Sequence, residues 1–310
     1  MSPLKRSRSL LTVAAVTCAV SLTAACAGTG SAANEDPAPQ ASSPAGDQSA
    51  SAQLAELLPA DIRSRGSIKV ASNVEYPPFE YYDTDNKTIV GLDKDLADAL
   101  GAKLGVKLEF NNMSFDAIIP ALAAKRFDMA MSAMTDNAER RKQVDFVDYF
   151  VSGGGFLVEK GNPHNVVNLE SICGLTVAID KGTTNVEDAD KASKACVAAG
   201  KKPVKADVYP GTSKIVLALQ NGRADIAMLD TSAAAYIASQ NAGEFEVPGE
   251  SYEPKPYGMV FPKGSTQLQA AVKAGLEALL ADGTYEKILA KWGQQVGAIK
   301  EFTVNDEATS

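Results

Sequence analysis

The chain has 310 residues, of which 45% are hydrophobic and 22% are charged, and its formal net charge is −8. A chain of this length and composition is globular and can form two lobes, each with its own core. The acidic balance argues against a nucleic-acid partner, which needs a basic surface patch. It suits a well-solvated protein outside the cytoplasm, although charge alone does not fix a compartment.

The N-terminus has the pattern of an export signal. Three basic residues, the last of them Arg8, precede an apolar stretch at 10–22 that is too short to span a membrane as a helix. Small residues then lead to Cys26, in a pattern that resembles the bacterial lipobox, where the cysteine is lipidated and becomes the new N-terminus. We expect residues 1–25 to be a lipoprotein signal peptide. The alternative is an ordinary secretory signal in which Cys26 is incidental.

The segment after this signal is made of small and polar residues. Residues 26–55 are rich in Ala, Ser, Gly and Pro and contain almost no large apolar side chain. Such a segment buries too little surface to offset the entropy lost on ordering. We therefore expect a lipid-anchored flexible tether that holds the folded body away from a membrane.

Cysteine and histidine usage bears on disulfides and metals. Cys173 and Cys196 form an even pair in a body that is expected to be exported, which predicts a disulfide. No C-x-x-C spacing occurs, and the single histidine, His164, stands beside a proline in a predicted loop. We therefore expect no metal and no cofactor.

Short β-rich runs alternate with helical patterns along the body, which predicts a parallel α/β sheet. The first half has predicted strands at 67–72 and 106–110 and predicted helices at 93–104, 115–124 and 138–144. The second half has predicted strands at 175–179 and 203–209, a helix that follows the turn at 182–185, and a helix at 213–220. The last elements are a strand at 257–261 and helices at 268–280 and 285–292.

One stretch of the sequence occurs twice. Residues 121–135 read ALAAKRFDMAMSAMT, and residues 218–231 read ALQNGRADIAMLDT. Each copy contains the end of a helix, an Arg-x-Asp turn and an apolar strand that ends in polar residues. In an open α/β sheet, ligands bind outside the carboxyl ends of the strands. The repeat therefore predicts two similar lobes whose polar strand ends face a cleft.

Six motifs in order along the chain carry a family resemblance. They are NVEYPPFEYYDTDNKTIVGLDKDLADAL (73–100), FDAIIPAL (115–122), AERRKQVDF (138–146), GTT (182–184), NGRADIAMLDT (221–231) and DGTYEKILAKWG (282–293). Together they resemble the bacterial extracellular solute-binding proteins of family 3, which have the type II periplasmic-binding fold. Within that family they resemble the polar amino-acid receptors that supply ABC importers, from about Gly66 to Trp292.

The resemblance implies an α/β Venus-flytrap fold, in which two lobes are joined by two crossing hinge strands. We expect the crossings near 150–155 and 252–257, so that lobe 1 comprises 66–152 and 255–300 and lobe 2 comprises 153–254. The implied protein is a monomeric, lipid-anchored receptor on the outer side of the cell membrane. It would bind a free amino acid between its lobes, close on it and deliver it to ABC permease subunits.

The resemblance assigns the carboxylate of the ligand to Arg140, whose planar guanidinium can donate two parallel hydrogen bonds to it. Thr183 and Thr184 stand at a helix start, where free N–H groups and the helix dipole favour an anion. Because Arg140 belongs to lobe 1 and the threonines to lobe 2, the carboxylate would be held from both sides. The alternative is that Arg140 is a surface residue beside Arg141 and Lys142.

The resemblance assigns the ammonium group of the ligand to Asp230. A backbone carbonyl near Ser132 and Ala133, together with the Thr135 hydroxyl, would complete three acceptors for the three N–H donors. The alternative role for Asp230 is the N-cap of the helix that follows it.

The remaining predicted contacts concern the ligand side chain. Tyr76 and Phe115 are expected to form aromatic walls, with a place in the core as the alternative. Asn73 and Asp180 follow or end the first strand of each half and are expected to set specificity. Because a buried carboxylate needs a partner, Asp180 favours a basic ligand such as arginine, lysine, ornithine or citrulline, with glutamine and asparagine next.

Two other functions use the same scaffold. An enzyme resembling the cyclohexadienyl dehydratases would need a general acid in the cleft, for which Asp180 and Glu75 are the local candidates. We expect no enzyme, because the anchors for a carboxylate and an ammonium need no reaction to explain them. A receptor that presents its ligand to a membrane sensor is the other alternative, and the sequence does not separate it from transport.

Overall fold

The computed structural model describes residues 45–305 of the chain. Within them, most strands form one sheet in the order β5-β1-β6-β12-β7-β10-β8-β9, with β11 beside β7, and β2-β3-β4 form a small second sheet. The strands are β1 (Ser67–Ser72), β2 (Glu75–Tyr76), β3 (Glu80–Tyr82), β4 (Ile89–Val90), β5 (Lys107–Asn112), β6 (Met129–Thr135), β7 (Val144–Glu159), β8 (Thr176–Asp180), β9 (Lys205–Tyr209), β10 (Ile226–Asp230), β11 (Phe245–Glu246) and β12 (Tyr252–Pro262).

Helices alternate with these strands, as the sequence predicts for an α/β protein. They are α1 (Ala45–Glu56), α2 (Ala60–Arg65), α3 (Leu92–Leu104), α4 (Ile118–Ala123), α5 (Ala138–Arg141), α6 (Thr184–Ala198), α7 (Thr212–Gln220), α8 (Thr231–Gln240), α9 (Thr266–Ala281) and α10 (Thr284–Lys291). Three short 3₁₀ turns complete the description: Phe115–Ala117, Leu169–Ile172 and Gln295–Gly297.

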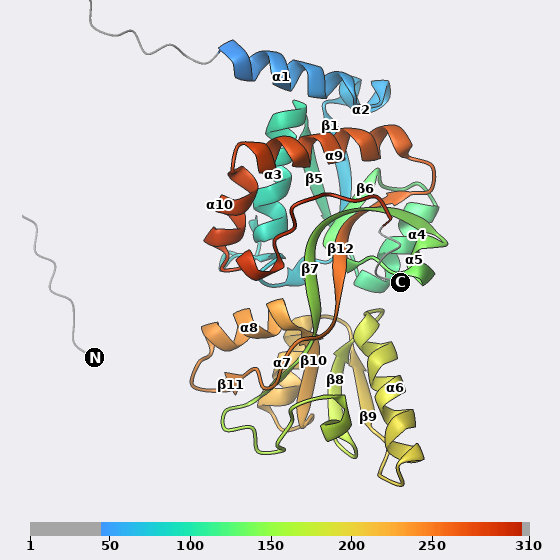
Figure 1. Cartoon of the computed structure of the whole chain (residues 1–310), viewed down its shortest axis with the longest axis vertical. Coiled ribbons are helices and arrows are strands. Elements are labelled where there is room, and N and C mark those ends of the chain that lie inside the picture. The colour runs from blue at the N-terminus through green and yellow to red at the C-terminus, as the bar shows by residue number, and fades with distance from the viewer. Residues whose placement is uncertain (1–44, 306–310) are drawn as a thin grey trace, which may run out of the picture. The chain divides into compact units, whose positions relative to one another are not determined.

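The described body has two lobes joined by β7 and β12, which run side by side between them (Figure 1). β7 pairs antiparallel with β12 from Val144, opposite Pro262 in lobe 1, to Gly154, opposite Tyr252 where the chain enters lobe 2. The same strand then pairs with β10 of lobe 2, where Leu157 lies opposite Ala227. The sheet is therefore continuous through both lobes, and the two predicted crossing strands are present.

Glycines allow close backbone approach where β7 passes between the lobes. A Cβ atom on Gly154 would lie 2.2 Å from the Tyr252 ring, and one on Gly155 would lie 2.8 Å from the hydroxyl of Thr231. With a side chain at either position, the ring of Tyr252 or the side chain of Thr231 would have to move. The Gly-Gly-Gly run within β7 thus lets the crossing pack against its neighbours.

The two copies of the repeated stretch make the same contacts at the start of their strands. In lobe 1 the Asp128 carboxylate accepts a hydrogen bond from Lys69 N (2.6 Å), and Asp128 N donates to Lys69 O (3.0 Å). In lobe 2 the Asp225 carboxylate accepts from Thr176 N (2.7 Å), and Asp225 N donates to Thr176 O (2.8 Å). Each aspartate therefore ties the start of one strand to the start of its parallel neighbour.

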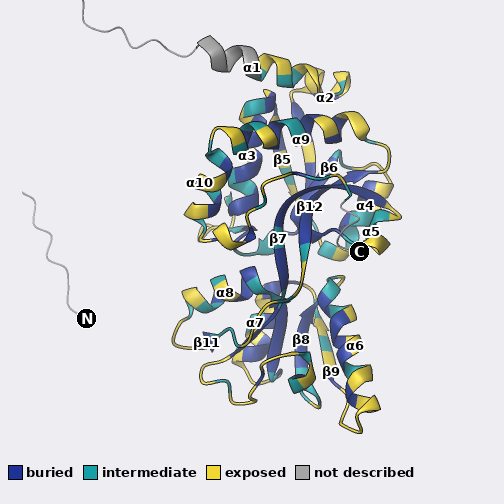
Figure 2. Ribbon diagram, in the orientation of Figure 1, coloured by how far each residue is buried: buried dark blue, intermediate teal, exposed yellow. Residues whose placement is uncertain are grey.

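Each lobe has its own core against the sheet (Figure 2). In lobe 1, Leu96 of α3 and Leu276 of α9 are fully buried against the sheet. In lobe 2, the predicted disulfide between Cys173 and Cys196 is present, with the two Cα atoms 5.6 Å apart. It fastens α6 to the segment before β8, and closing such a loop stabilises the fold by about 3 kcal/mol on chain-entropy grounds.

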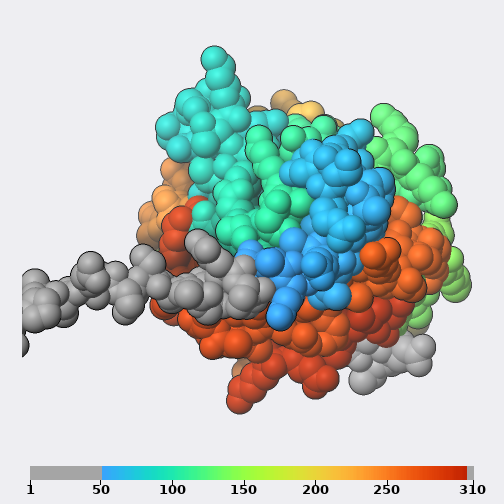
Figure 3. Space-filling view, turned by 90° about the horizontal axis from the view of Figure 1, so that it is seen from above, coloured from blue at the N-terminus to red at the C-terminus, as the bar shows by residue number. Residues whose placement is uncertain are grey.

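The structure corrects the expected extent of the tether. Residues 45–55, predicted to be flexible, belong to α1, which packs against α3 and α9. Leu54 packs on the lobe 1 core, and the Ser51 hydroxyl donates to Lys103 O (2.9 Å). In Figure 3 the blue start of the body lies beside the orange surface of α9. A weak helix former is stabilised here by docking, which composition does not reveal.

A second correction concerns the predicted helix at 138–144. The helix ends at Arg141, and Val144 begins β7, where a β-branched residue packs well beside its buried neighbours. The predicted signal peptide, the Cys26 anchor and the tether up to residue 44 lie outside the described residues. Among the described helices, none is long and apolar enough to cross a membrane.

Candidate functional site

A cavity lies between the two lobes, at the carboxyl ends of strands from both. Glu80 lines it together with all eleven predicted contact residues, namely Asn73, Tyr76, Phe115, Ser132, Ala133, Thr135, Arg140, Asp180, Thr183, Thr184 and Asp230. The volume of the cavity is about 20 Å³, which is room for about one water molecule. The side chains of the two lobes are therefore close together around it.

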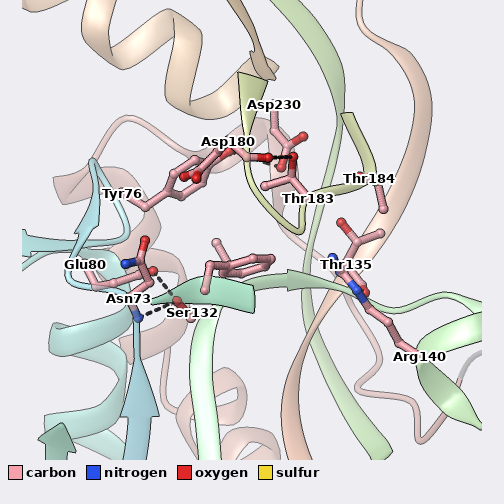
Figure 4. Close-up of a pocket in the computed structure, with 12 residues that line it drawn as sticks. Asn73, Tyr76, Glu80, Ser132, Thr135, Arg140, Asp180, Thr183, Thr184 and Asp230 are labelled. Atoms are coloured by element: carbon pink, nitrogen blue, oxygen red, sulfur yellow. Dashed lines mark hydrogen bonds between the residues drawn. The ribbon is translucent and has the colours of Figure 1, made fainter. Parts of the chain in front are cut away.

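The lining residues fall into two ends (Figure 4). Arg140, Thr135 and Thr184 lie at one end, and Asn73 and Tyr76 lie at the other. The cavity therefore separates a cationic end from an end that carries polar and aromatic side chains.

Arg140 is positioned by the turn after β6. Asn137 caps α5 by accepting from Arg140 N (2.9 Å), which fixes the backbone of the arginine. Its guanidinium donates to Thr135 O (2.7 Å) and, across the cleft, to Gly182 O (3.1 Å). The guanidinium also lies 5.5 Å from the centre of the Phe115 ring. Burial lowers the pKa of Arg140 to about 10, so the side chain stays cationic at neutral pH.

The N-terminus of α6 faces the same end of the cavity. Thr183 is the N-cap residue, but its side chain caps no helix N–H and donates instead to Asp180 O (2.8 Å). The first-turn N–H groups of α6 therefore have no side-chain cap. Such N–H groups and the helix dipole attract an anion, which is the environment that the sequence predicted at Thr183 and Thr184.

Asp230 is held by hydrogen-bond donors from both lobes. Its Oδ2 accepts from Tyr76 (3.1 Å) and from the Tyr257 hydroxyl, and its Oδ1 accepts from Asn185 Nδ2 (3.2 Å). Burial raises the pKa of Asp230, while these donors and then the charge of Arg140 lower it. Asp230 is the N-cap residue of α8, yet its side chain makes no cap hydrogen bond. The capping alternative does not describe this carboxylate.

The end of β6 supplies the floor of the cavity. The Ser132 hydroxyl accepts from Asn73 N (3.0 Å) and donates to Glu80 Oε1 (2.7 Å). Ala133 has a φ of 43°, and its N–H donates to Asp93 (3.2 Å). The backbone thus turns sharply where the strand meets the cavity, and these contacts hold the turn in place.

Asn73 and Asp180 face each other from the two lobes as hydrogen-bond acceptors. Asn73 Nδ2 donates to Met113 O (3.1 Å), which leaves Oδ1 as the free end of its amide. Asp180 is 5% exposed, and its Oδ1 accepts from Gly211 N (2.9 Å). Burial is the main cause that raises the pKa of Asp180. Two acceptors therefore stand at this end of the cavity.

The sequence did not identify Glu80 as part of the site. This carboxyl is fully buried, and burial followed by the charge of Asp93 raises the pKa of Glu80 well above its ordinary value. Asp93 in turn accepts from the Tyr149 hydroxyl (2.7 Å). Glu80 lies within the motif that carries the family resemblance, but nothing in the local pattern marks it as the buried acid.

Contacts outside the cavity also join the lobes. Asp116 of lobe 1 forms an ion pair with Lys181 of lobe 2 (2.7 Å). The hydroxyls of Tyr81 and Tyr236 lie 3.0 Å apart across the cleft. Together with the Arg140–Gly182 bond, these contacts connect the two lobes around the cavity.

Comparison with known proteins covers both lobes. Residues 68–295 match the family model described as bacterial extracellular solute-binding proteins, family 3. A curated relative, the arginine-binding protein ArgT of Corynebacterium glutamicum, is 31% identical over 256 residues, which are 82% of this chain and 83% of that protein.

Solved structures with the same architecture are also similar in sequence. An ancestral arginine-binding protein bound to arginine is 36% identical with a TM-score of 0.67, over 74% of this chain and 98% of that chain. An ancestral amino acid-binding protein, described as a precursor of cyclohexadienyl dehydratase, is 32% identical with a TM-score of 0.67, over 75% and 97% of the two chains. These likenesses confirm the predicted two-lobed α/β fold.

Proposed function

The chain belongs to the bacterial extracellular solute-binding proteins, family 3, and we propose that it binds a free amino acid with a basic or amide side chain for an ABC importer. The observation that carries this proposal is the pairing of charges in one cavity. Arg140 and the start of α6 offer an anion site, and Asp230 offers a cation site. A free amino acid carries a carboxylate and an ammonium on one carbon, and so complements both.

The carboxylate would lie between Arg140 and the first turn of α6. In the structure the Arg140 guanidinium donates to two backbone carbonyls, and a guanidinium has five N–H donors. Donors therefore remain for the ligand. Each hydrogen bond to a charged group contributes about 1.5–3 kcal/mol, so this contact is a main source of affinity for any amino acid.

The ammonium would lie against Asp230, with acceptors from the end of β6. Three donors already hold the Asp230 carboxylate, which has about four acceptor sites in all. The fixed carboxylate needs little further ordering to accept a bond from the ligand, which favours binding. Aromatic rings at Tyr76 and Phe115 would enclose the aliphatic part of the ligand.

The side chain would point to Asn73 and Asp180. Both residues present acceptors at that end, so a donor-rich tip such as a guanidinium, an ammonium or an amide is favoured over an acid. The relatives named for arginine agree with the basic part of this range. We place arginine first among candidate ligands and glutamine second.

The finer features of the receptor belong to the same proposal. We propose a monomeric lipoprotein anchored through Cys26 on the outer face of the cell membrane, with lobe 1 at 66–152 and 255–300 and lobe 2 at 153–254. The ligand would close the lobes by adding contacts that exist only between them, and the closed form would dock on permease subunits. A ligand-presenting role toward a membrane sensor is the alternative, and neighbouring permease and ATPase genes would decide for transport.

An enzyme on the same scaffold is the second candidate function. Glu80 favours it, because burial raises the pKa of this carboxyl and a carboxyl with a raised pKa is suited to act as a general acid. One structurally similar protein is described as a precursor of a dehydratase. The test is incubation of the purified protein with cyclohexadienyl acids. Turnover that Glu80→Gln abolishes would support an enzyme, and no turnover would leave binding as the function.

A thermal-shift screen of free amino acids, followed by calorimetry, tests binding. A ligand at 100 times its Kd adds about 2.7 kcal/mol to the free energy of unfolding, which gives a clear rise in melting temperature. We expect arginine to give the largest rise. If no amino acid or close derivative raises the melting temperature, the proposal fails. Agmatine, which lacks the carboxylate of arginine, is the matched control and should give no rise.

A further inference from the structure

A second cavity adjoins the binding cavity at its side-chain end. The two cavities share three lining residues, Asn73, Phe115 and Asp180. The volume of the second cavity is about 270 Å³, and the volume of the first is about 20 Å³. We call the second cavity the outer chamber. The site is therefore tightly closed around the anchors for the carboxylate and ammonium, and it widens beyond Asn73 and Asp180.

The outer chamber is lined by side chains that can move. Lys214 and Ser114 are exposed, and Met113 is only half-buried. A group that enters the chamber would therefore meet water and adjustable side chains. By contrast, Ser132, Thr135 and Ala133 near the ammonium position are buried and held in place.

The charge around the chamber selects the kind of group that enters. Three carboxylates, of Glu75, Asp116 and Asp180, and two lysines, Lys181 and Lys214, line the chamber, so that acidic groups are in excess by one. Lys181 of the same chamber is engaged in the ion pair with Asp116 (2.7 Å). A cationic or neutral group is accepted in this field, and an additional carboxylate is disfavoured.

We infer that the site also takes cationic amino acids that carry a small uncharged substituent on the outermost side-chain nitrogen, with the substituent lying in the outer chamber. This rests on the proposed function, since the anchors at Arg140 and Asp230 set the direction of the ligand. The nitrogen meets the acceptors of Asn73 and Asp180, and its remaining bond points out of the tight cavity. The ligand class is thus ω-N-substituted arginines and lysines.

Calorimetry with two isomers tests the inference on the purified protein. The ligands are L-arginine, Nω-methyl-L-arginine and Nα-methyl-L-arginine, so that the same methyl group is placed at either end. An extra methyl group that a packed site cannot accept costs about 10- to 200-fold in affinity. We expect the Nω-methyl ligand to bind within about threefold of arginine, because its methyl group enters open space, and the Nα-methyl ligand to lose about 100-fold.

The outcomes separate this inference from the proposed function. A loss of more than about tenfold for the Nω-methyl ligand, with arginine still bound, would overturn the inference and leave amino-acid binding intact. Binding of a neutral amino acid without arginine would overturn the inference and the preference for a cation. No binding of any amino acid would overturn the proposed function itself.

A variant that fills the chamber adds a second measurement. Lys214→Trp would place a large ring in the chamber, and Leu217→Trp, at an exposed position on the same helix α7 and outside the chamber, is the matched control. The readout is the ratio of the Nω-methyl to the arginine affinity. We expect this ratio to fall about tenfold in Lys214→Trp and to stay unchanged in Leu217→Trp. Equal ratios in the two variants would show that the substituent lies elsewhere.

Discussion

The two copies of the repeated stretch, at 121–135 and 218–231, make the same contacts where their strands start and different contacts where their strands end. At the start of their strands, Asp128 and Asp225 make matching hydrogen bonds to the backbone of Lys69 and Thr176. At the end of the strands, lobe 1 presents a sharp turn at Ala133, and lobe 2 presents the carboxylate of Asp230. The strand starts therefore stabilise the fold in the same way in both lobes, and the strand ends differ between the lobes.

The largest expected loss of affinity comes from a substitution beyond the end of β6. Arg140→Ala should lower the affinity for every amino acid by about 100-fold or more, because two or more charged hydrogen bonds of about 1.5–3 kcal/mol are lost. Calorimetry measures the loss, and Lys142→Ala, at an exposed position two residues away, is the control. Unchanged affinity in Arg140→Ala would mean that the carboxylate is held elsewhere.

Asp230→Asn should give the next largest effect. Removing the charge while keeping the shape should cost about 10- to 100-fold for all amino acids. Analogues that lack the ammonium group should bind the variant and the original protein equally. If the variant instead loses affinity for those analogues too, Asp230 acts by holding Tyr76 and Asn185 in place and not by binding the ammonium.

Asp180→Asn should lower the affinity for arginine more than the affinity for glutamine. We expect a loss of about tenfold for arginine and less than about threefold for glutamine, because only the cation depends on the charge of the carboxylate. Asp190→Asn, at an exposed position on α6 outside both cavities, is the control and should leave both affinities unchanged. Equal losses for arginine and glutamine would remove Asp180 from the specificity of the site.

The pH dependence of ligand affinity tests the role of the Asp180 charge without a substitution. Burial raises the pKa of Asp180, so the carboxylate takes up a proton at higher pH than an exposed aspartate does. The carboxylate loses its charge as the pH is lowered. The ratio of arginine to glutamine affinity should therefore decrease as the pH falls from neutral toward the ordinary pKa range of aspartate. A ratio that stays constant over this range would contradict the prediction.

The smallest expected effect on binding comes from the strand starts. Asp128→Ala or Asp225→Ala should lower the free energy of unfolding by about 1–2 kcal/mol. Each variant loses one hydrogen bond to a backbone N–H, and Asp128 also loses a partly exposed ion pair with Arg65. Affinity for arginine should stay within about threefold. Denaturant titration and calorimetry on the same samples give both values. A large loss of affinity in either variant would break the separation between strand starts and strand ends.

The sequence predicted much of the fold because its pattern is local. The alternating apolar runs of β1, β6, β8 and β10 and the amphipathic helices are visible residue by residue. Helix α1 was predicted as tether because its stability comes from docking on α3 and α9, and not from its own Ala- and Ser-rich sequence. Val144 was placed in a helix because the short charged run before it hides the start of β7.

For the site too, the sequence predicts what depends on local motifs and does not predict contacts that form only in the folded chain. All eleven predicted residues line the cavity, while their contacts with a ligand stay a prediction. The sequence does not reveal Glu80, because its burial comes from the packing of the folded lobe and its hydrogen-bond donor, Ser132, is 52 residues away along the chain. Tyr257 was expected only as part of a strand, and its hydroxyl contact with Asp230 arises from the pairing of β12 with β7.

Because the chain enters and leaves lobe 2 through the two crossing strands, lobe 2 is one continuous segment that could be exchanged with that of a relative. The chain leaves lobe 1 along β7 and returns along β12, and Gly154 and Tyr252 are register partners at that point. Two splice junctions placed side by side would therefore transplant one continuous segment. A chimera built this way would take Asp180, the start of α6 and Asp230 from the donor and keep Asn73 and Arg140 from the host. The contacts that lobe 2 makes with the ligand would then come from the donor protein, in one segment of sequence.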